Sequence, residues 1–92
     1  MPYITKEART RLDQGGKPKT TGELNYTISR VVDDYLLQKG ELRYEYLNEV
    51  MGALECAKLE LYRRVIVPYE DTKLAESGDI YQIPKKNNTI IN

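Results

Sequence analysis

Residues 41–67 form the longest stretch of this chain that local chemistry leaves free to be helical. The stretch contains one glycine, Gly52, and no proline, and it ends at Pro68. Its many charged side chains exclude a membrane-spanning segment, which needs about 20 mostly apolar residues. In a chain of 92 residues a helix of this length sets the architecture, because the other elements must pack against it.

Composition excludes several classes of function. The chain has no histidine, so a nucleophile–histidine hydrolase is excluded, and with a single cysteine a zinc site lacks its usual ligands. Fourteen basic residues balance fourteen acidic ones, which argues against general nucleic-acid binding. We therefore expect a protein that is not an enzyme and has no cofactor, metal or membrane partner. The lone cysteine also favours a reducing compartment, the cytoplasm.

Two shorter helices are predicted before the long one. Thr5 can cap a helix over residues 5–12, and residues 13–19 have loop composition. Thr20 and Glu23 have the spacing of a capping box at the start of a second helix, and Gly40 can end that helix in the left-handed conformation. The second helix has an amphipathic stripe made of Leu24, Ile28, Val31, Val32, Tyr35 and Leu36.

The long helix has two apolar sides. At about 100° per residue, a broad face predicted to be the core comprises Tyr46, Leu47, Val50, Met51, Ala53, Leu54, Ala57, Leu61, Tyr62 and Val65. A thinner seam on the other side contains Gly52, Cys56, Leu59 and Ile66. Heptad spacing of Gly52, Leu59 and Ile66 indicates a second helix contact, which a symmetric copy could supply. The alternative is that this seam covers a terminal segment of the same chain.

The chain after Pro68 is predicted to be shorter and more polar. Residues 69–77 can form a C-terminal helix that Gly78 closes, and residues 80–83 are expected to be extended. We expect residues 1–83 to form a single helical domain and residues 84–92 a polar tail.

A small group of cationic and aromatic residues is the candidate ligand site: Lys58, Tyr62, Arg63, Arg64 and Tyr69. Arginine matches phosphate and tyrosine stacks on bases, so the group could bind an anionic nucleotide. The ordinary alternatives are an ion pair of Lys58 with Glu55, Asp33 or Asp34, and a pair of Arg64 with Glu60.

Five strings of the sequence carry a family resemblance: residues 2–4, 22–26, 47–64, 68–71 and 78–81. Together they resemble a small family found in tailed bacteriophages and prophage-bearing bacteria, a family with no established function and no assigned catalytic residues. Residues 52–68 are also similar in outline to the second helix of helical-hairpin phage proteins that sequester cyclic-nucleotide signals. That likeness implies that Lys58, Arg63 and Arg64 face an anion, although Glu55 and Glu60 would repel phosphate unless neutralised.

The predicted fold is all-α. A helical hairpin of about residues 21–38 and 42–67 pairs through its apolar stripes, with short N- and C-terminal helices, in a homo-oligomer that uses Gly52, Cys56, Leu59 and Ile66. The expected function is a non-catalytic, phage-type interaction protein that acts on a phage or host protein in the cytoplasm of a bacterial host. Two alternatives are a sponge for a small anionic cyclic nucleotide and a virion or assembly component.

Overall fold

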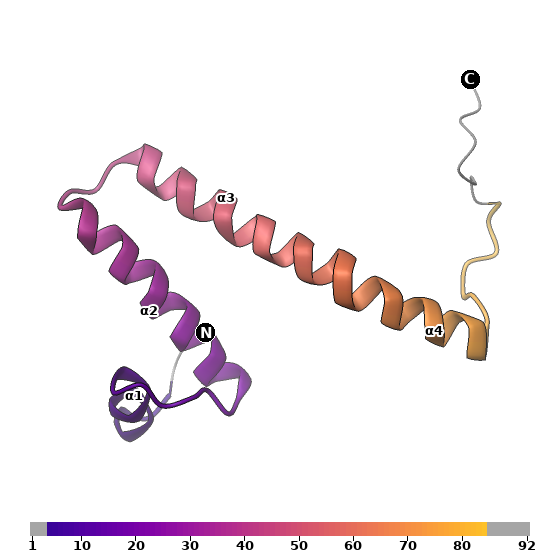
Figure 1. Ribbon diagram of the computed structural model, residues 1–92, viewed down its shortest axis with the longest axis horizontal. Helices are drawn as coiled ribbons and strands as arrows, with labels where there is room; N and C mark the ends of the chain where they lie inside the picture. The colour runs from indigo at the N-terminus through magenta and orange to yellow at the C-terminus, as the bar shows by residue number, and fades with distance from the viewer. Residues whose placement is uncertain (1–3, 85–92) are drawn as a thin grey trace. The chain divides into compact units, whose positions relative to one another are not determined.

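The computed structural model describes residues 4–84 (Figure 1). Every regular element among these residues is helical, which confirms the all-α class. The contacts within the chain divide the protein into two units, Met1–Ala53 and Leu54–Asn92. The predicted polar tail, residues 84–92, lies outside the described residues except for Pro84.

The first unit begins with helix α1, Lys6–Asp13. The side chain of Thr5 accepts a hydrogen bond from the backbone N–H of Ala8, which confirms the predicted cap. The loop that follows returns close to the end of α1, where the backbone N–H of Gly16 donates to the carbonyl of Arg11 at 2.9 Å. A β-carbon at Gly16 would lie 2.8 Å from that carbonyl oxygen, so this close approach requires glycine.

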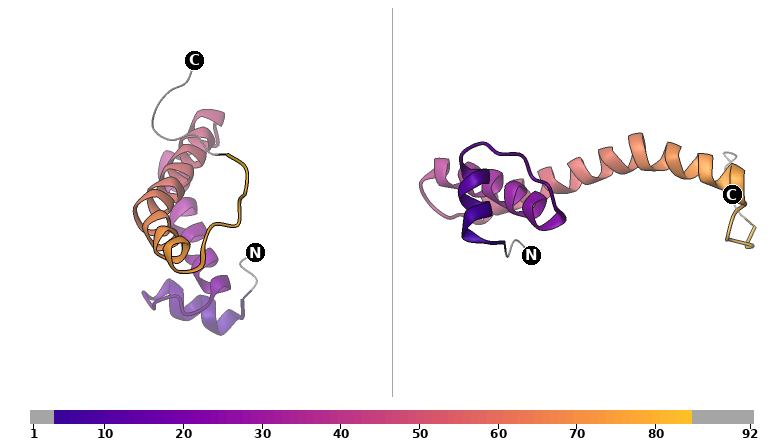
Figure 2. Two further views of the ribbon diagram at one scale, coloured as in Figure 1. Left: turned by 90° about the vertical axis from the view of Figure 1, so that its right-hand side faces the viewer. Right: turned by 90° about the horizontal axis from the view of Figure 1, so that it is seen from below.

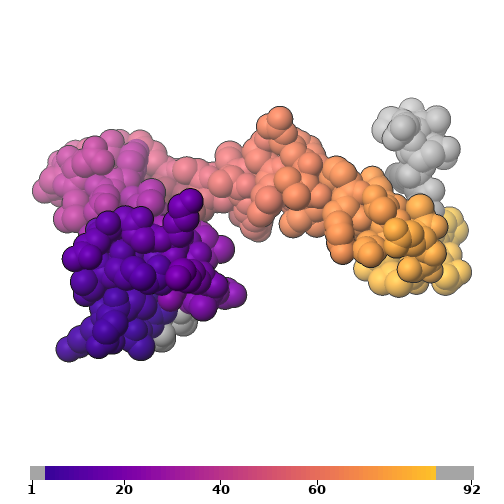
Figure 3. Space-filling model, turned by 60° about the horizontal axis from the view of Figure 1, so that its bottom comes forward, coloured from indigo at the N-terminus to yellow at the C-terminus, as the bar shows by residue number. Residues whose placement is uncertain are grey.

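Helix α2, Thr21–Lys39, begins at the predicted cap. The Thr20 hydroxyl accepts from the N–H of Glu23 at 3.1 Å, whereas the Glu23 carboxylate accepts from the N–H of Lys19 at 2.9 Å. In a capping box the Glu23 carboxylate would accept a hydrogen bond from the N–H of the cap residue, Thr20. It accepts instead from the N–H of Lys19, one residue earlier in the sequence. Gly40 ends α2 with φ 79° and ψ −10°, the left-handed conformation that was expected. Helix α1 and the loop after it pack against the first turns of α2 (Figure 3).

Helix α3, Tyr44–Leu61, starts slightly later than predicted. The carbonyl of Arg43 accepts from the N–H groups of Tyr46 and Leu47, so the first helical turn closes at Arg43 rather than at residues 41 or 42. Near the turn, α3 contacts α2 through polar groups. Tyr35 donates its hydroxyl to Glu49 at 2.7 Å, and the ammonium of Lys39 lies over the rings of Tyr35 and Tyr46.

The helical backbone does not stop before Pro68, which corrects the prediction. Helix α3 continues into a π-helical turn η1, Tyr62–Ile66, and then into α4, Val67–Ser77 (Figures 1 and 2). Pro68 lies in the first turn of α4, where its missing N–H is tolerated because the turn before it bonds with a different spacing. Gly78 ends α4 with φ 85°, and residues 78–84 are not helical.

Burial is confined to one side chain among the described residues. Tyr26 on α2 is 9% exposed and is the sole buried hydrophobic residue there. The broad face of the long helix, predicted to be the core, is not buried: Leu47, Leu54 and Leu61 are 39%, 40% and 54% exposed. That prediction was wrong for each unit taken by itself, because neither unit supplies a layer of its own side chains that covers this face.

Candidate functional site

The π turn η1 is the most unusual backbone feature near the predicted ligand site. The N–H of Val67 donates to the carbonyl of Tyr62, five residues earlier, instead of the usual four. This spacing inserts one extra residue into the helix just before Pro68. Isolated π turns are common at functional sites, and Tyr62, Arg63 and Arg64 lie within this one.

The two arginines of the turn share one carboxylate. Arg63 and Arg64 both form ion pairs with Glu60, and the Arg64 pair measures 3.2 Å. The two arginine side chains remain 68% and 74% exposed. Exposed pairs of this kind contribute little stability, at most about 1 kcal/mol each. The predicted pair of Arg64 with Glu60 is thus present, and Glu60 offsets part of the positive charge that an anion would need.

Two more of the predicted ligand-binding residues, Lys58 and Tyr69, also have partners within the second unit, and Tyr62 is 49% exposed. Lys58 forms an ion pair with Glu55 at 3.2 Å, and its side chain is 69% exposed. Asp33 and Asp34 pair instead with Arg30 on their own helix, at 3.2 and 3.5 Å.

The last predicted ligand residue, Tyr69, is 62% exposed, and Lys73 lies over its ring at 5.6 Å. A hollow of about 320 Å³ beside α4 is lined by residues that include Lys73, Leu74 and Tyr81, and by none of the five predicted ligand residues. The structure therefore places the five along one helical segment without gathering them in that hollow.

The predicted interface seam is exposed but does not run straight. Gly52 has open space where a β-carbon would lie, Cys56 is exposed, and Leu59 is 48% exposed. Ile66 is 37% exposed and lies in the π turn. Because the turn contains one extra residue, Ile66 is rotated by about one residue, roughly 100°, from the line through Gly52 and Leu59. Ile66 therefore does not lie on the same side of the helix as Gly52 and Leu59. The interface role of the seam remains a prediction.

A polar network between α1 and α2 was not predicted from the sequence. Arg11 forms an ion pair with Glu23 and donates to the carbonyl of Lys17 at 2.7 Å. The bond from Arg11 holds the pKa of Glu23 below its ordinary value, and the N–H of Lys19 acts in the same direction. Because the pKa of Glu23 is lower in the folded state than in the unfolded state, its carboxylate stabilises the contact between α1 and α2 at pH values above the unfolded-state pKa. This contribution is lost as the pH falls through the folded-state pKa.

Tyr26 lies beside this network. Its hydroxyl donates to Asp13 at 2.8 Å, which raises the pKa of Tyr26, and the guanidinium of Arg9 lies over its ring at 5.6 Å. Arg30 approaches Asp13 at 3.9 Å from the next turn of α2. The side-chain pairs that join α1 to α2, such as Arg11 with Glu23 and Tyr26 with Asp13, are 12 or more residues apart in sequence, so no local spacing rule could have identified them. This network holds α1 against α2. Its ion pairs, Arg11 with Glu23 and Arg30 with Asp13, form between side chains of the same chain.

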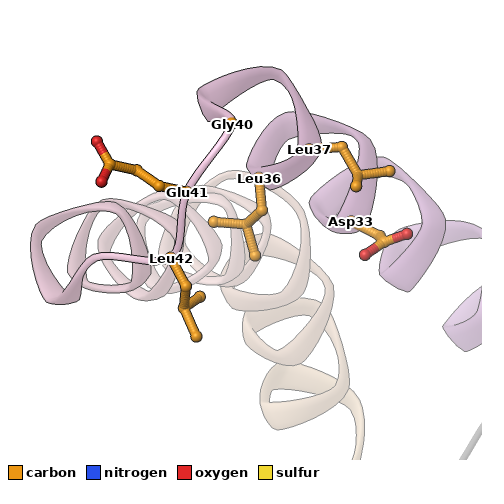
Figure 4. Close-up of a pocket in the computed structure, with 6 residues that line it drawn as sticks. All are labelled: Asp33, Leu36, Leu37, Gly40, Glu41 and Leu42. Carbon is orange, nitrogen blue, oxygen red and sulfur yellow. The ribbon is translucent and has the colours of Figure 1, made fainter.

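A second hollow lies where α2 ends (Figure 4). It has a volume of about 420 Å³, and Leu36, Leu37 and Leu42 line it, with the carboxylates of Asp33 and Glu41 at either side. Its lining is mostly apolar, with an acidic rim.

Comparison with known proteins gives a family but no activity. Within the part of the chain that the structure describes, no helix combines the length and apolar character needed to cross a membrane. No curated protein and no solved structure matches the sequence. Residues 1–80 match the family described as a domain of unknown function, DUF6899. Since the match covers most of its length, the chain belongs to the DUF6899 family.

Proposed function

We propose that this protein is a non-catalytic helical interaction protein, which self-associates and presents apolar helix faces to a protein partner. One observation carries the proposal. Among residues 4–84 a single hydrophobic side chain is buried, while large apolar side chains on α2, α3, η1 and α4 are exposed. Exposed apolar surface on this scale marks an interaction surface in a folded protein.

The energetics of a small chain support the same proposal. Full burial of one leucine, isoleucine or valine contributes about 1.5–3 kcal/mol, and folding must offset a backbone entropy cost of about 1–2 kcal/mol per residue. One buried tyrosine cannot offset that cost for the helices of the described residues. Small chains commonly obtain the missing burial by association, so a partner surface completes the fold.

The hairpin is part of this proposal. In the first unit, the bond from Tyr35 to Glu49 and the position of Lys39 over the ring of Tyr46 join α2 to the start of α3 next to the turn. These contacts support antiparallel pairing of the two helices through the stripe that contains Leu24, Ile28 and Val31, which are now 50%, 43% and 65% exposed.

The biological setting of the proposal comes from the sequence. The resemblance to a phage and prophage family suggests a phage or host protein as the partner, and the single cysteine is consistent with the cytoplasm of a bacterial host. The absence of histidine throughout the chain supports a binding role over acid–base catalysis.

Light scattering during gel filtration tests the proposal. We expect a molar mass of at least twice the 10.7 kDa of one chain at micromolar concentration, with a helical circular dichroism signal that falls on dilution. If the protein is a monomer whose helical content stays unchanged over a roughly 100-fold dilution, self-association is not the source of its stability.

A nucleotide sponge is a second candidate, and the π turn is the observation that favours it. Arg63 and Arg64 lie in that turn with most of their side-chain surface exposed, near Tyr69. If Glu60 releases them, their guanidinium groups can bind phosphate. Calorimetry with a panel of cyclic dinucleotides should then show heat that is lost in Arg63→Ala. No heat across the panel would exclude this candidate and leave the interaction proposal intact.

A further inference from the structure

Within the first unit, polar and aromatic side chains join the start of α3 to α2. The hydroxyl of Tyr35 donates to the carboxylate of Glu49 at 2.7 Å. The ammonium of Lys39 lies 4.7 Å from the ring centre of Tyr35 and 5.3 Å from the ring centre of Tyr46. These contacts bridge the two helices beside the turn that connects them, and the four residues that make them are named here the α2–α3 latch.

Apart from these contacts, little apolar surface is buried where the two helices meet. Along α2, and along α3 as far as Ala53, no Cα atom of one helix lies within 8 Å of a Cα atom of the other. Closely packed helices have axes about 8–10 Å apart, which brings some of their Cα atoms nearer than that. Residues 28–53 are all described, and they are exposed except for two half-buried side chains on each helix: Val32, Leu36, Tyr46 and Val50. The α2–α3 latch therefore contributes a large part of what joins these helices.

The turn between the two helices has the properties of a hinge. Gly40 has a left-handed backbone, and Glu41 and Leu42 border the hollow of about 420 Å³ at the end of α2 (Figure 4). Leu42 is 77% exposed, so a rotation of the backbone here displaces no buried side chain. Arg43 pairs with Glu41 at 3.6 Å and with Glu45 at 3.3 Å, and neither partner belongs to α2. Hinges are commonly a few loop or helix-terminal residues of this kind.

The contacts of the latch are of a strength that can be broken and remade. Tyr35 is 37% exposed, and both Lys39 and Glu49 are exposed. Loss of a hydrogen bond to a charged group shifts an equilibrium by roughly tenfold. Loss of a cation–π contact at an exposed site shifts it by about two- to fivefold. A conformation favoured by factors of this size coexists with a minor conformation populated at about 0.1–10%.

We propose that the turn of residues 40–43 is a hinge which the α2–α3 latch holds closed, so that release of the bond from Tyr35 to Glu49 lets α3 swing away from α2. Opening exposes the four half-buried side chains beside the turn and adds them to the apolar surface of the first unit. Any partner that prefers the opened form shifts the equilibrium toward it. The device operates within one chain, whether or not copies associate, and so goes beyond the proposed function.

Distances between two spin labels in the full chain test the hinge. In a background that carries Cys56→Ser, the labels are attached at Ser29→Cys on α2 and Asn48→Cys on α3, which are exposed positions outside the latch. Labelled chains are diluted with an excess of unlabelled chains, so that each distance is measured within one copy. We expect one main distance in this background. In Tyr35→Phe the population of a longer distance should rise by about three- to tenfold.

Further variants distinguish release of the latch from a general loss of structure. Tyr44→Phe removes a hydroxyl from a residue that is 81% exposed and outside the latch, so it should leave the distances as in the background. Tyr35→Phe combined with Glu49→Ala should open the turn no further than the more open of the two single variants, because both remove the same bond. Circular dichroism should show the same helical content in every variant.

Three results would overturn the latch. The first is a distance distribution in Tyr35→Phe that matches the background. The second is an equal change in Tyr44→Phe. The third is a double variant whose opening is the product of the two single effects, because the two side chains then act independently. Each of these results is read within one copy, so none of them depends on whether the protein self-associates.

Discussion

Leu61→Asp is expected to convert the protein into monomers and to reduce its helical content. Leu61 lies on the broad apolar face of the long helix and is 54% exposed, so in the proposed self-association the substitution places a carboxylate from each copy in an apolar contact. An unpaired buried charge costs about 3–5 kcal/mol, and two copies carry it, so the dissociation constant should rise by at least about 1,000-fold. Loss of the partner should then melt η1 and α4, because an isolated helix of this length is marginal in water.

Leu59→Asp is the matched control for this substitution. Leu59 and Leu61 are 48% and 54% exposed, so burial within one chain cannot distinguish them. Leu59 lies on the thin seam, and we expect Leu59→Asp to change the dissociation constant by less than about threefold, as for an exposed surface site. Light scattering and circular dichroism on both variants decide between the two surfaces. Monomers from Leu59→Asp with intact oligomers from Leu61→Asp would show that the thin seam is the interface.

Tyr26→Ala is expected to release α1 from α2. Tyr26 is the sole buried hydrophobic residue in the described part of the chain, and its ring and hydroxyl contact Arg9 and Asp13. Truncation of a buried aromatic residue typically costs about 3–5 kcal/mol. At the lower value the amides of α1 should exchange with solvent roughly 100-fold faster, because that free energy protects them from local opening.

Two further variants separate the sources of the Tyr26 effect. Tyr26→Phe keeps the ring and removes only the bond to Asp13, so it should cost about 1 kcal/mol. Tyr44→Ala removes a side chain that is 81% exposed and should change exchange in α1 by less than about threefold. Exchange in α1 that stayed at the wild-type rate in Tyr26→Ala would show that the Arg11–Glu23 pair, and not the buried ring, holds the helix.

The helix ends were predictable because their chemistry is local. Thr5 and Thr20 accept the cap bonds that their sequence positions indicated, and Gly40 has the left-handed backbone that ends α2. Each of these depends on groups within about four residues, so the order of residues is sufficient to predict it. The ion pair of Lys58 with Glu55 was predictable for the same reason.

Pro68 shows where a local rule fails. Proline removes one helical hydrogen bond, and the sequence therefore indicated an end to the helix before it. The backbone instead changed its bonding at η1, so that helix continued through Ser77. A propensity rule considers whether one bond can form; it does not consider that a neighbouring turn can change its own spacing.

The sequence by itself determined the helical class, the caps and the two apolar sides of the long helix, because these follow from bond geometry and from a repeat of 3.6 residues per turn. Only the tertiary structure decided that Tyr26 is buried against α1, that the π turn moves Ile66 out of line, and that neither unit by itself buries its part of the broad apolar face. The physical reason is that burial depends on which distant surfaces meet. A periodic pattern specifies that a face must be covered, but not whether the cover comes from the same chain or from another.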